Sequence, residues 1–187
     1  MLPFDRHWLL TSTFYGNWLP GDEQGCVTTV VGAGPTRARH NIPGAAYDGP
    51  MPGLHRSARA LLKGDPVRLD ARLAEVAVRQ FRETAAYRGW GLLAAAVMSN
   101  HVHIVVGVPG DPDPCNLQRD FKSYAGRALS AAAGRPAAGT WWTEGGSRRK
   151  LAWDGAVRRA VAYVLDQPGR LAVWDGYAPG ERGVSAP

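Results

Sequence analysis

Two short apolar runs that follow each other directly, at residues 90–98 and 100–108, constrain the fold more than any other feature of the sequence. The polar pair Ser99-Asn100 lies at their junction. Short apolar runs joined by a tight polar turn are typical of two neighbouring antiparallel strands. The sequence therefore predicts a β-hairpin in the middle of the chain.

Strand and helix signals surround this hairpin in a regular order. An aromatic and β-branched run predicts a first strand, and apolar residues at helical spacing predict helices between Asp70 and Gly89 and from Asp113 onward. A tryptophan-rich strand, a Gly-Gly turn and a basic return segment should follow, and then a last helix with Asp154 as its N-cap. The order is β-α-β-β-α-β with an added C-terminal helix, so we predict an α+β, ferredoxin-like antiparallel sheet. The predicted elements are a strand at 8–15, a helix at 70–88, strands at 90–98 and 100–108, a helix at 113–133, the tryptophan-rich segment at 139–153 and a helix at 155–167.

The chain length and composition suit a single domain. With 187 residues, 45% of them hydrophobic, the chain can build one sizeable core. Proline and glycine are frequent between about residues 16 and 69, which predicts a long irregular insertion. We expect residues 1–175 to form the domain and residues 176–187 to be a loose tail.

The charge balance and the cysteines indicate the partners and the compartment. The net charge is +6 and the pI is about 9.7, which suits a polyanion such as nucleic acid, although a GC-rich bacterial proteome gives similar values. Cys26 and Cys115 form no zinc or redox motif, so we expect a reducing cytosol. The N-terminal residues show no signal segment and no apolar run is long enough to span a membrane. The protein is therefore expected to be cytoplasmic and associated with the nucleoid when it acts on DNA.

Two histidines alternate with aliphatic residues in the second strand of the hairpin, in the sequence His101-Val102-His103-Ile104. Because side chains alternate across a strand, His101 and His103 point to the same face. Two imidazoles on one rigid face can share a metal ion. The alternative, two half-buried polar residues, would need a satisfied hydrogen-bond network for each ring.

The last predicted helix carries Tyr163 and Gln167, four residues apart and therefore one turn apart on the same face. The expected core stripe of this helix is Val157, Val161 and Val164. Tyr163 lies beside that stripe, where its hydroxyl could point into a site. An ordinary tyrosine at the edge of the core is the alternative.

Together these segments resemble the single-tyrosine HUH transposases, which include the REP-associated tyrosine transposases and the small transposases of simple insertion sequences. The family's metal motif is His-hydrophobic-His, and its C-terminal helix carries the nucleophilic tyrosine. The resemblance implies His101, His103 and Gln167 as metal ligands and Tyr163 as the nucleophile. Many relatives have another residue or a shifted glutamine after the tyrosine, which leaves Asp166 as an alternative third ligand. The segments at 11–22 and 121–124 are also similar to this group, whereas residues 25 to about 69 match none of its motifs.

The activity that this resemblance implies is cleavage and rejoining of single-stranded DNA through a covalent 5′-phosphotyrosine. A divalent ion, Mg²⁺ or Mn²⁺, would serve as Lewis acid, and a site with two histidines favours Mn²⁺ in vitro. No nucleotide cofactor is expected, since the phosphodiester bond energy is kept in the ester and the chain has no phosphate-binding glycine loop. The partner would be single-stranded or hairpin DNA. A homodimer is also compatible, because small transposases of this type often work as dimers.

Six basic residues are candidates for DNA contact, and one further tyrosine is a rival nucleophile. Tyr124 falls on the expected core stripe of its helix, so we interpret it as a core residue. Of Trp141 and Trp142, which alternate faces in the predicted strand, one is expected in the core and the other could stack on a base. The candidate DNA-binding residues are Arg119, Lys122, Arg127, Arg148, Arg149 and Lys150.

Two other functions are compatible with parts of this pattern. A domesticated DNA-hairpin-binding protein would keep the fold without cleavage, but it would have no reason to keep His101, His103, Tyr163 and Gln167 together. A histidine-triad nucleotide hydrolase would need a third alternating histidine, where this chain has Val105.

Overall fold

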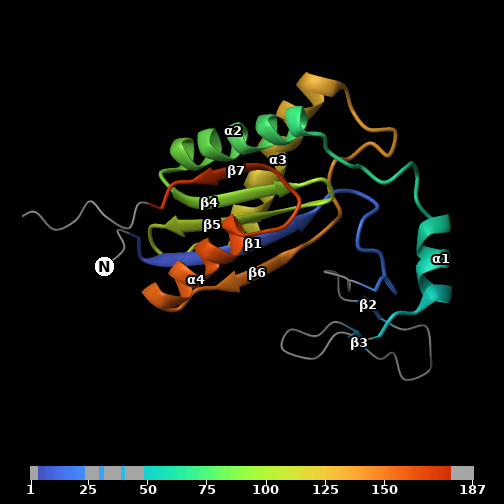
Figure 1. The fold of residues 1–187 in the computed structure, drawn as a ribbon, viewed down its shortest axis with the longest axis horizontal. Helices are drawn as coiled ribbons and strands as arrows, with labels where there is room; N and C mark the ends of the chain where they lie inside the picture. Colours follow the sequence, from blue (N-terminus) through green and yellow to red (C-terminus); the bar gives the residue numbers. More distant parts are fainter. Residues whose placement is uncertain (1–3, 24–29, 32–38, 41–48, 178–187) are drawn as a thin grey trace, which may run out of the picture.

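The main sheet of the structure has five antiparallel strands and carries helices on both faces (Figure 1). The structure is a computed structural model, and it describes residues 4–23, 30–31, 39–40 and 49–177. The strand order is β6-β1-β5-β4-β7, and each neighbouring pair is antiparallel. The elements are β1 (Arg6–Thr13), β2 (Val30–Val31), β3 (Arg39–His40), α1 (Pro52–Ala60), α2 (Ala71–Arg88), β4 (Gly91–Met98), β5 (His101–Val108), α3 (Pro114–Ala133), β6 (Ser147–Lys150), α4 (Asp154–Leu165) and β7 (Arg170–Asp175).

The ferredoxin-like prediction is confirmed by this topology. The elements β1-α2-β4-β5-α3-β6 give the predicted β-α-β-β-α-β order, and in the sheet their strands are arranged as fourth, first, third and second. The hairpin predicted from the two apolar runs is β4–β5, and Val97 pairs with Val102 at its tip. The added C-terminal helix is α4.

Helix ends follow the capping signals in the sequence, with one exception. The Asp70 carboxylate accepts a hydrogen bond from the Leu73 amide at 2.7 Å, and Gly89 ends α2 in the left-handed conformation with φ 68°. Asp154 was predicted to cap the last helix, and this is wrong. Asp154 is the first residue of α4, where its negative charge favours the helix N-terminus, and Trp153 is the N-cap residue without a side-chain bond.

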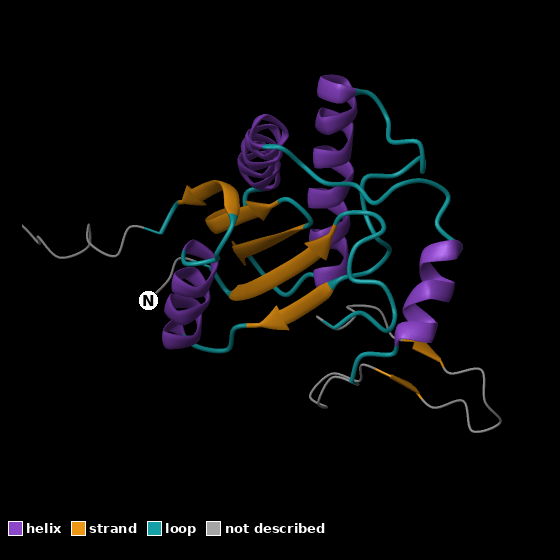
Figure 2. Ribbon diagram, turned by 45° about the vertical axis from the view of Figure 1, so that its right-hand side comes forward, coloured by secondary structure: helices purple, strands orange, loops and turns teal. Residues whose placement is uncertain are grey.

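The two faces of the sheet carry separate hydrophobic clusters. Helices α2 and α3 cover one face, where alternate β5 residues such as Val102 and Ile104 point into the larger cluster. Helix α4 covers the opposite face, where it packs against Val105 of β5 and against Leu93, Ala94, Ala96 and Met98 of β4. Figures 1 and 2 show α4 on the other side of the sheet from α2 and α3. The two histidines therefore share their face with α4.

The last third of the chain differs from the prediction in two places. The tryptophan-rich segment is not a strand; Trp142 makes only an isolated bridge with Phe14, and the basic segment Ser147–Lys150 forms the edge strand β6. Strand β7 was not predicted. It pairs with β4, and its apolar residues at 171–174 form a run too short for periodicity to assign.

The predicted insertion contains regular structure in its described part. Helix α1 lies there, and β2 pairs with β3 through Val30 and His40. The rest of the insertion, residues 24–29, 32–38 and 41–48, and most of the predicted tail, residues 178–187, lie outside the described residues. Among the helices that the structure describes, none has the length and hydropathy to cross a membrane.

Candidate functional site

His101 and His103 lie next to each other on the α4 face of strand β5. Their ring centroids are 4.9 Å apart at an interplanar angle of 82°. Val102 between them points into the opposite cluster, as the alternation of a strand requires. Both rings are therefore held by the rigid centre of the sheet.

Each ring uses its Nδ1 atom in a hydrogen bond. His103 Nδ1 is 2.8 Å from the Thr11 hydroxyl on the neighbouring strand, and His101 Nδ1 is 2.6 Å from the side-chain oxygen of Asn100. An amide oxygen only accepts, so Nδ1 of His101 donates and its Nε2 carries the lone pair. Partners of this kind orient a ring for ligation through Nε2.

Burial keeps both imidazoles neutral at physiological pH. Desolvation lowers the pKa of His101 to about 4, and desolvation together with the neighbouring His101 lowers the pKa of His103 to about 3. The neutral ring is the form that binds a metal ion. Trp18 contributes to the burial of His101, since the two ring centroids are 4.7 Å apart. The backbone of Trp18 is in the left-handed region, at φ 51°.

Tyr163 projects from α4 toward the histidines. Its ring centroid is 5.3 Å from that of His103, and about half of the residue (49%) is exposed. The predicted core stripe, Val157, Val161 and Val164, is buried against the sheet. Tyr163 is thus placed beside the core stripe, as predicted, and between a histidine and solvent.

A cavity of about 490 Å³ lies beside Tyr163 and His103. Arg149 of β6 and Arg159 of α4 line it. Arg149 was among the predicted DNA-binding residues, whereas Arg159 was not. Arg159 lies four residues before Tyr163, one turn away on the same helix face, and this spacing is the sequence signal that could have identified it.

Gln167 lies just beyond the end of α4 and does not line this cavity. Its amide nitrogen donates to the Tyr163 backbone oxygen at 3.0 Å. Asp166, the alternative ligand, is the exposed C-cap residue. The structure therefore brings together His101, His103 and Tyr163, and it holds Gln167 against the backbone of Tyr163.

The two imidazoles fit a divalent ion by chemistry and orientation. They are neutral, buried on one face, and tied at Nδ1, which suits Mn²⁺ or a similar cation. Across the residues that the structure describes, no three His, Cys, Asp or Glu side chains are grouped as a metal site. A third ligand would then be an amide such as that of Gln167, or an oxygen of the substrate.

Tyr124, the rival nucleophile, lies on the wrong face of the sheet. It belongs to α3 and is half-buried against Tyr87 of α2 and Arg127, at ring distances of 6.3 and 4.5 Å. The sheet separates it from the histidines. The prediction that Tyr124 is a core residue is wrong, because the buried stripe of α3 is Leu117, Phe121, Ala125 and Leu129, and Tyr124 lies beside it.

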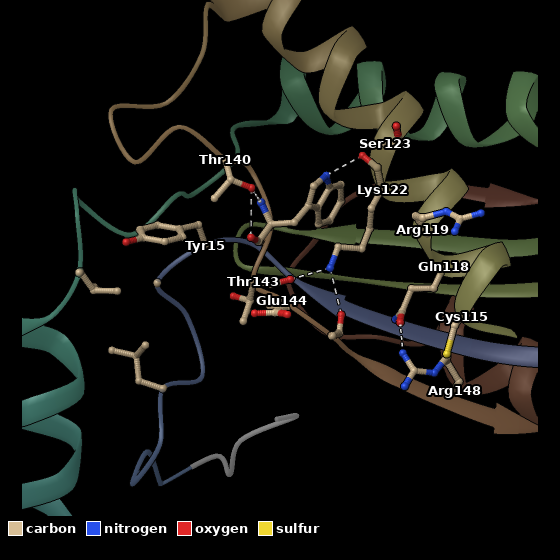
Figure 3. Close-up of a pocket in the computed structure, with 15 residues that line it drawn as sticks. Tyr15, Cys115, Gln118, Arg119, Lys122, Ser123, Thr140, Thr143, Glu144 and Arg148 are labelled. Carbon is tan, nitrogen blue, oxygen red and sulfur yellow. Dashed lines mark hydrogen bonds between the residues drawn. The ribbon is translucent and has the colours of Figure 1, made fainter. Parts of the chain in front are cut away.

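The other predicted basic residues fall into two groups. Arg119, Lys122 and Arg148 line a second cavity of about 700 Å³ on the α3 side of the sheet (Figure 3). Arg127 and Lys150 line neither this cavity nor the one beside Tyr163. Arg127 donates to Ser123, and Lys150 lies 3.9 Å from Asp111.

Both neighbouring tryptophans belong to the core, so the prediction that one of them lies outside it is wrong, although Trp142 also lines the cavity on the α3 side. Trp141 and Trp142 are each 8% exposed. Their indole nitrogens donate to Ser130 and to the backbone oxygen of Lys122, both at 2.8 Å. The segment is not a strand, so the alternation rule does not apply to it.

Comparisons with known proteins give structural likeness alone. No family model matches the chain, and no curated protein matches it. It is similar to a REP-associated tyrosine transposase solved with a REP hairpin, at 13% identity and a TM-score of 0.47, over 86% of this chain and 65% of that one. It is also similar to a candidate transposase from Deinococcus radiodurans, at 14% identity and a TM-score of 0.43, over 85% and 87%. The chain thus spans just under two thirds of the first of these proteins.

Proposed function

We propose that this protein is a DNA transposase of the single-tyrosine HUH type, which cleaves and rejoins single-stranded DNA through a 5′-phosphotyrosine. The observation that supports this most is the placement of Tyr163 against His103, in a cavity that also contains two arginines. A tyrosine that only packed at the core's edge would not need paired neutral imidazoles beside it.

The proposed reaction is an exchange of one phosphoester bond for another. The Tyr163 phenolic oxygen attacks the scissile phosphorus and forms a P–O bond, while the bond from phosphorus to the 3′-oxygen breaks. The phenol loses its proton and the leaving 3′-oxygen takes one up, so no proton is gained or lost overall. A 3′-hydroxyl from the same or another strand reverses the step and rejoins the DNA.

Arg149 and Arg159 have the position to hold the scissile phosphate. Both residues line the cavity beside Tyr163, and guanidinium groups form charge-assisted hydrogen bonds to phosphate oxygens. Arg159 also lies over the Trp153 ring at 4.5 Å, which limits the directions it can take. Both side chains would offset charge as it develops on the phosphate.

His101 and His103 would hold the divalent ion, with Gln167 as the third protein ligand in our proposal. The ion would supply Lewis-acid stabilisation of the non-bridging phosphate oxygens. Thr11 and Asn100 would keep the two rings in the ligating orientation. The activity would therefore depend on Mg²⁺ or Mn²⁺ and on no nucleotide.

The test is an adduct assay on DNA that flanks the gene. End-labelled single strands containing the neighbouring genomic hairpins are incubated with protein in Mn²⁺ or EDTA and separated on a denaturing gel. We expect an SDS-resistant protein–DNA adduct that needs metal and is lost in Tyr163→Phe. Tyr124→Phe is the matched control, since it removes a hydroxyl from the opposite face of the sheet and should leave the adduct unchanged.

Binding without an adduct would contradict the proposed chemistry. Equal hairpin affinity for wild type and Tyr163→Phe, with no covalent product in any metal, would instead identify a domesticated DNA-binding protein. An adduct that survives Tyr163→Phe and disappears in Tyr124→Phe would place the nucleophile on α3.

A further inference from the structure

The second cavity lies on the α3 side of the sheet and is separate from the cavity beside Tyr163. Its volume, about 700 Å³, is within the range that holds small ligands. Residues from β1's C-terminal loop, α3, β6 and the segment before β6 line it (Figure 3). The proposed cleavage reaction assigns it no role.

One end of this cavity is cationic. The Lys122 ammonium donates to the backbone oxygens of Thr143 and Gly145, at 2.6 and 3.0 Å, which leaves one of its three N–H donors (Figure 3). Arg119 and Arg148 also line the cavity, and Glu144 is the one acidic side chain among the lining residues. The net charge at this end is therefore positive.

A buried amide holds Arg148 in place. The Gln118 side chain is 3% exposed, and its oxygen accepts from Arg148 at 2.7 Å while its nitrogen donates to the Thr11 backbone oxygen at 2.8 Å. Gly146 passes so close to the Gln118 amide that a Cβ would clash with it. Four of the five guanidinium N–H donors of Arg148 are not used in the bond to Gln118. The cation is thus fixed by a buried partner on α3.

The other end of the cavity is apolar. Tyr15, Leu19 and Leu62 line it, and Trp142 forms part of the wall. The Tyr15 hydroxyl accepts from the Lys63 amide at 2.7 Å, which orients the ring. A planar, mostly apolar group fits beside such side chains, because aromatic and aliphatic surfaces accept any base without hydrogen-bond readout.

We propose that this cavity binds one unpaired nucleotide of the DNA, with its phosphate on Lys122 and Arg148 and its base between Tyr15 and the two leucines. The cationic and apolar ends match the two parts of a nucleotide. The identity of the polymer as DNA rests on the proposed function. The bound nucleotide would lie across the sheet from the scissile phosphate.

The test maps the contact directly in cleavage-deficient Tyr163→Phe protein. Hairpin oligonucleotides carry 5-iododeoxyuridine at one unpaired position each, are irradiated in complex, and the crosslinked peptides are identified by mass spectrometry. We expect one position to crosslink to Tyr15 or Trp142. Because the cavity is intact in this protein, the result does not depend on the folding of a cavity variant.

Charge variants then test the phosphate contact. Lys122→Met and Arg148→Met, each in the Tyr163→Phe background, should reduce the crosslink and weaken hairpin binding about tenfold each. Arg72→Met removes an equal charge from an exposed site on α2 and should change neither. Their melting curves show whether each variant is folded.

Crosslinks confined to the α4 face, or an undiminished crosslink in the folded Lys122→Met and Arg148→Met variants, would overturn the nucleotide site. The proposed cleavage is checked separately, by the adduct of wild-type protein on the same oligonucleotides. An adduct without a Tyr15 or Trp142 crosslink would refute this inference and leave the transposase function standing. The opposite result would retain the nucleotide site and refute cleavage.

Discussion

The two cavities lie on opposite faces of one sheet and differ in how their polar groups are prepared. On the α4 face, burial keeps two imidazoles neutral, and an exposed tyrosine lies beside them. On the α3 face, the polar groups are cations held in place by backbone carbonyl oxygens and a buried amide. Neutral imidazoles are suited to metal chemistry, and fixed cations are suited to holding a phosphate.

Thr11 of β1 is the residue that the two faces share. Its hydroxyl bonds to His103 on one face, and its backbone oxygen accepts from Gln118 on the other. The edge strand β6 has the same double role, since Arg148 lines the α3-side cavity and the adjacent Arg149 lines the cavity beside Tyr163. The alternation of a strand is what lets one basic segment serve both faces.

Removal of metal should have the largest effect and should act on the α4 face alone. EDTA is expected to reduce the rate of adduct formation by more than about a hundredfold, with recovery in Mn²⁺. The reason is that His101 and His103 would lose the ion that they are proposed to hold. Hairpin affinity, measured by fluorescence anisotropy, should change little. An equal loss of affinity in EDTA would show that the two faces do not separate catalysis from binding.

Gly146→Ala should lower the stability of the fold on the α3 face. Its φ is 141°, and a Cβ would meet the Gln118 amide and the Thr11 backbone oxygen. We expect the free energy of unfolding to fall by about 2–4 kcal/mol in urea denaturation. Gly145→Ala is the matched control, since its Cβ would enter open space at φ 74° and should cost only about 1 kcal/mol. Equal losses would refute the close packing around Gln118.

Two arginine variants should affect different quantities if the faces are distinct, one the rate of adduct formation and the other the hairpin affinity. Arg159→Met should lower the rate of adduct formation about tenfold and change hairpin affinity less than about threefold. Arg148→Met should lower affinity about tenfold and, at saturating protein, leave the adduct rate nearly unchanged. Single-turnover assays at saturating protein measure the first quantity and anisotropy measures the second. Identical profiles for both variants would break the comparison.

Lys122 should make hairpin affinity depend on pH. Desolvation, reinforced by Arg148 and opposed by Glu144, lowers the pKa of Lys122 to about 8. Below this pH the ammonium is charged and can hold a phosphate, and above it the charge is lost. We expect a three- to tenfold loss of affinity between about pH 7 and 9 at constant salt. In Lys122→Met the loss should be absent.

The same shift predicts the sign of a change in stability. Because the pKa is lower in the folded protein than in the unfolded chain, the unfolded chain binds more protons between about pH 8 and the ordinary lysine pKa. The contribution of Lys122 to the free energy of unfolding should therefore rise with pH in that window. Comparison of wild type with Lys122→Met by urea denaturation isolates this contribution.

The sequence was sufficient to predict the central sheet because its signals are local. The β4–β5 hairpin, the capped helix α2 and the shared face of His101 and His103 follow from periodicity and turn residues. Strand β7 was missed because the apolar run at residues 171–174 is too short for periodicity to distinguish a strand from a buried helix segment.

Long-range contacts in the site could not be predicted. The bond between Thr11 and His103 joins residues 92 positions apart, and that between Thr11 and Gln118 joins residues 107 apart. No local pattern records such pairs. The position of Gln167 was also beyond prediction, because α4 ends at Leu165 and the amide then bonds to the backbone of Tyr163.

The central claim is that Tyr163 forms the covalent bond to DNA. The most direct measurement is to digest the metal-dependent adduct with protease and nuclease and determine by mass spectrometry which peptide carries the remaining nucleotide. The account predicts a phosphodiester on Tyr163, through the 5′-phosphate of the DNA. A nucleotide on Tyr124 or on any other residue, or a phosphate linked through its 3′ end, would contradict it.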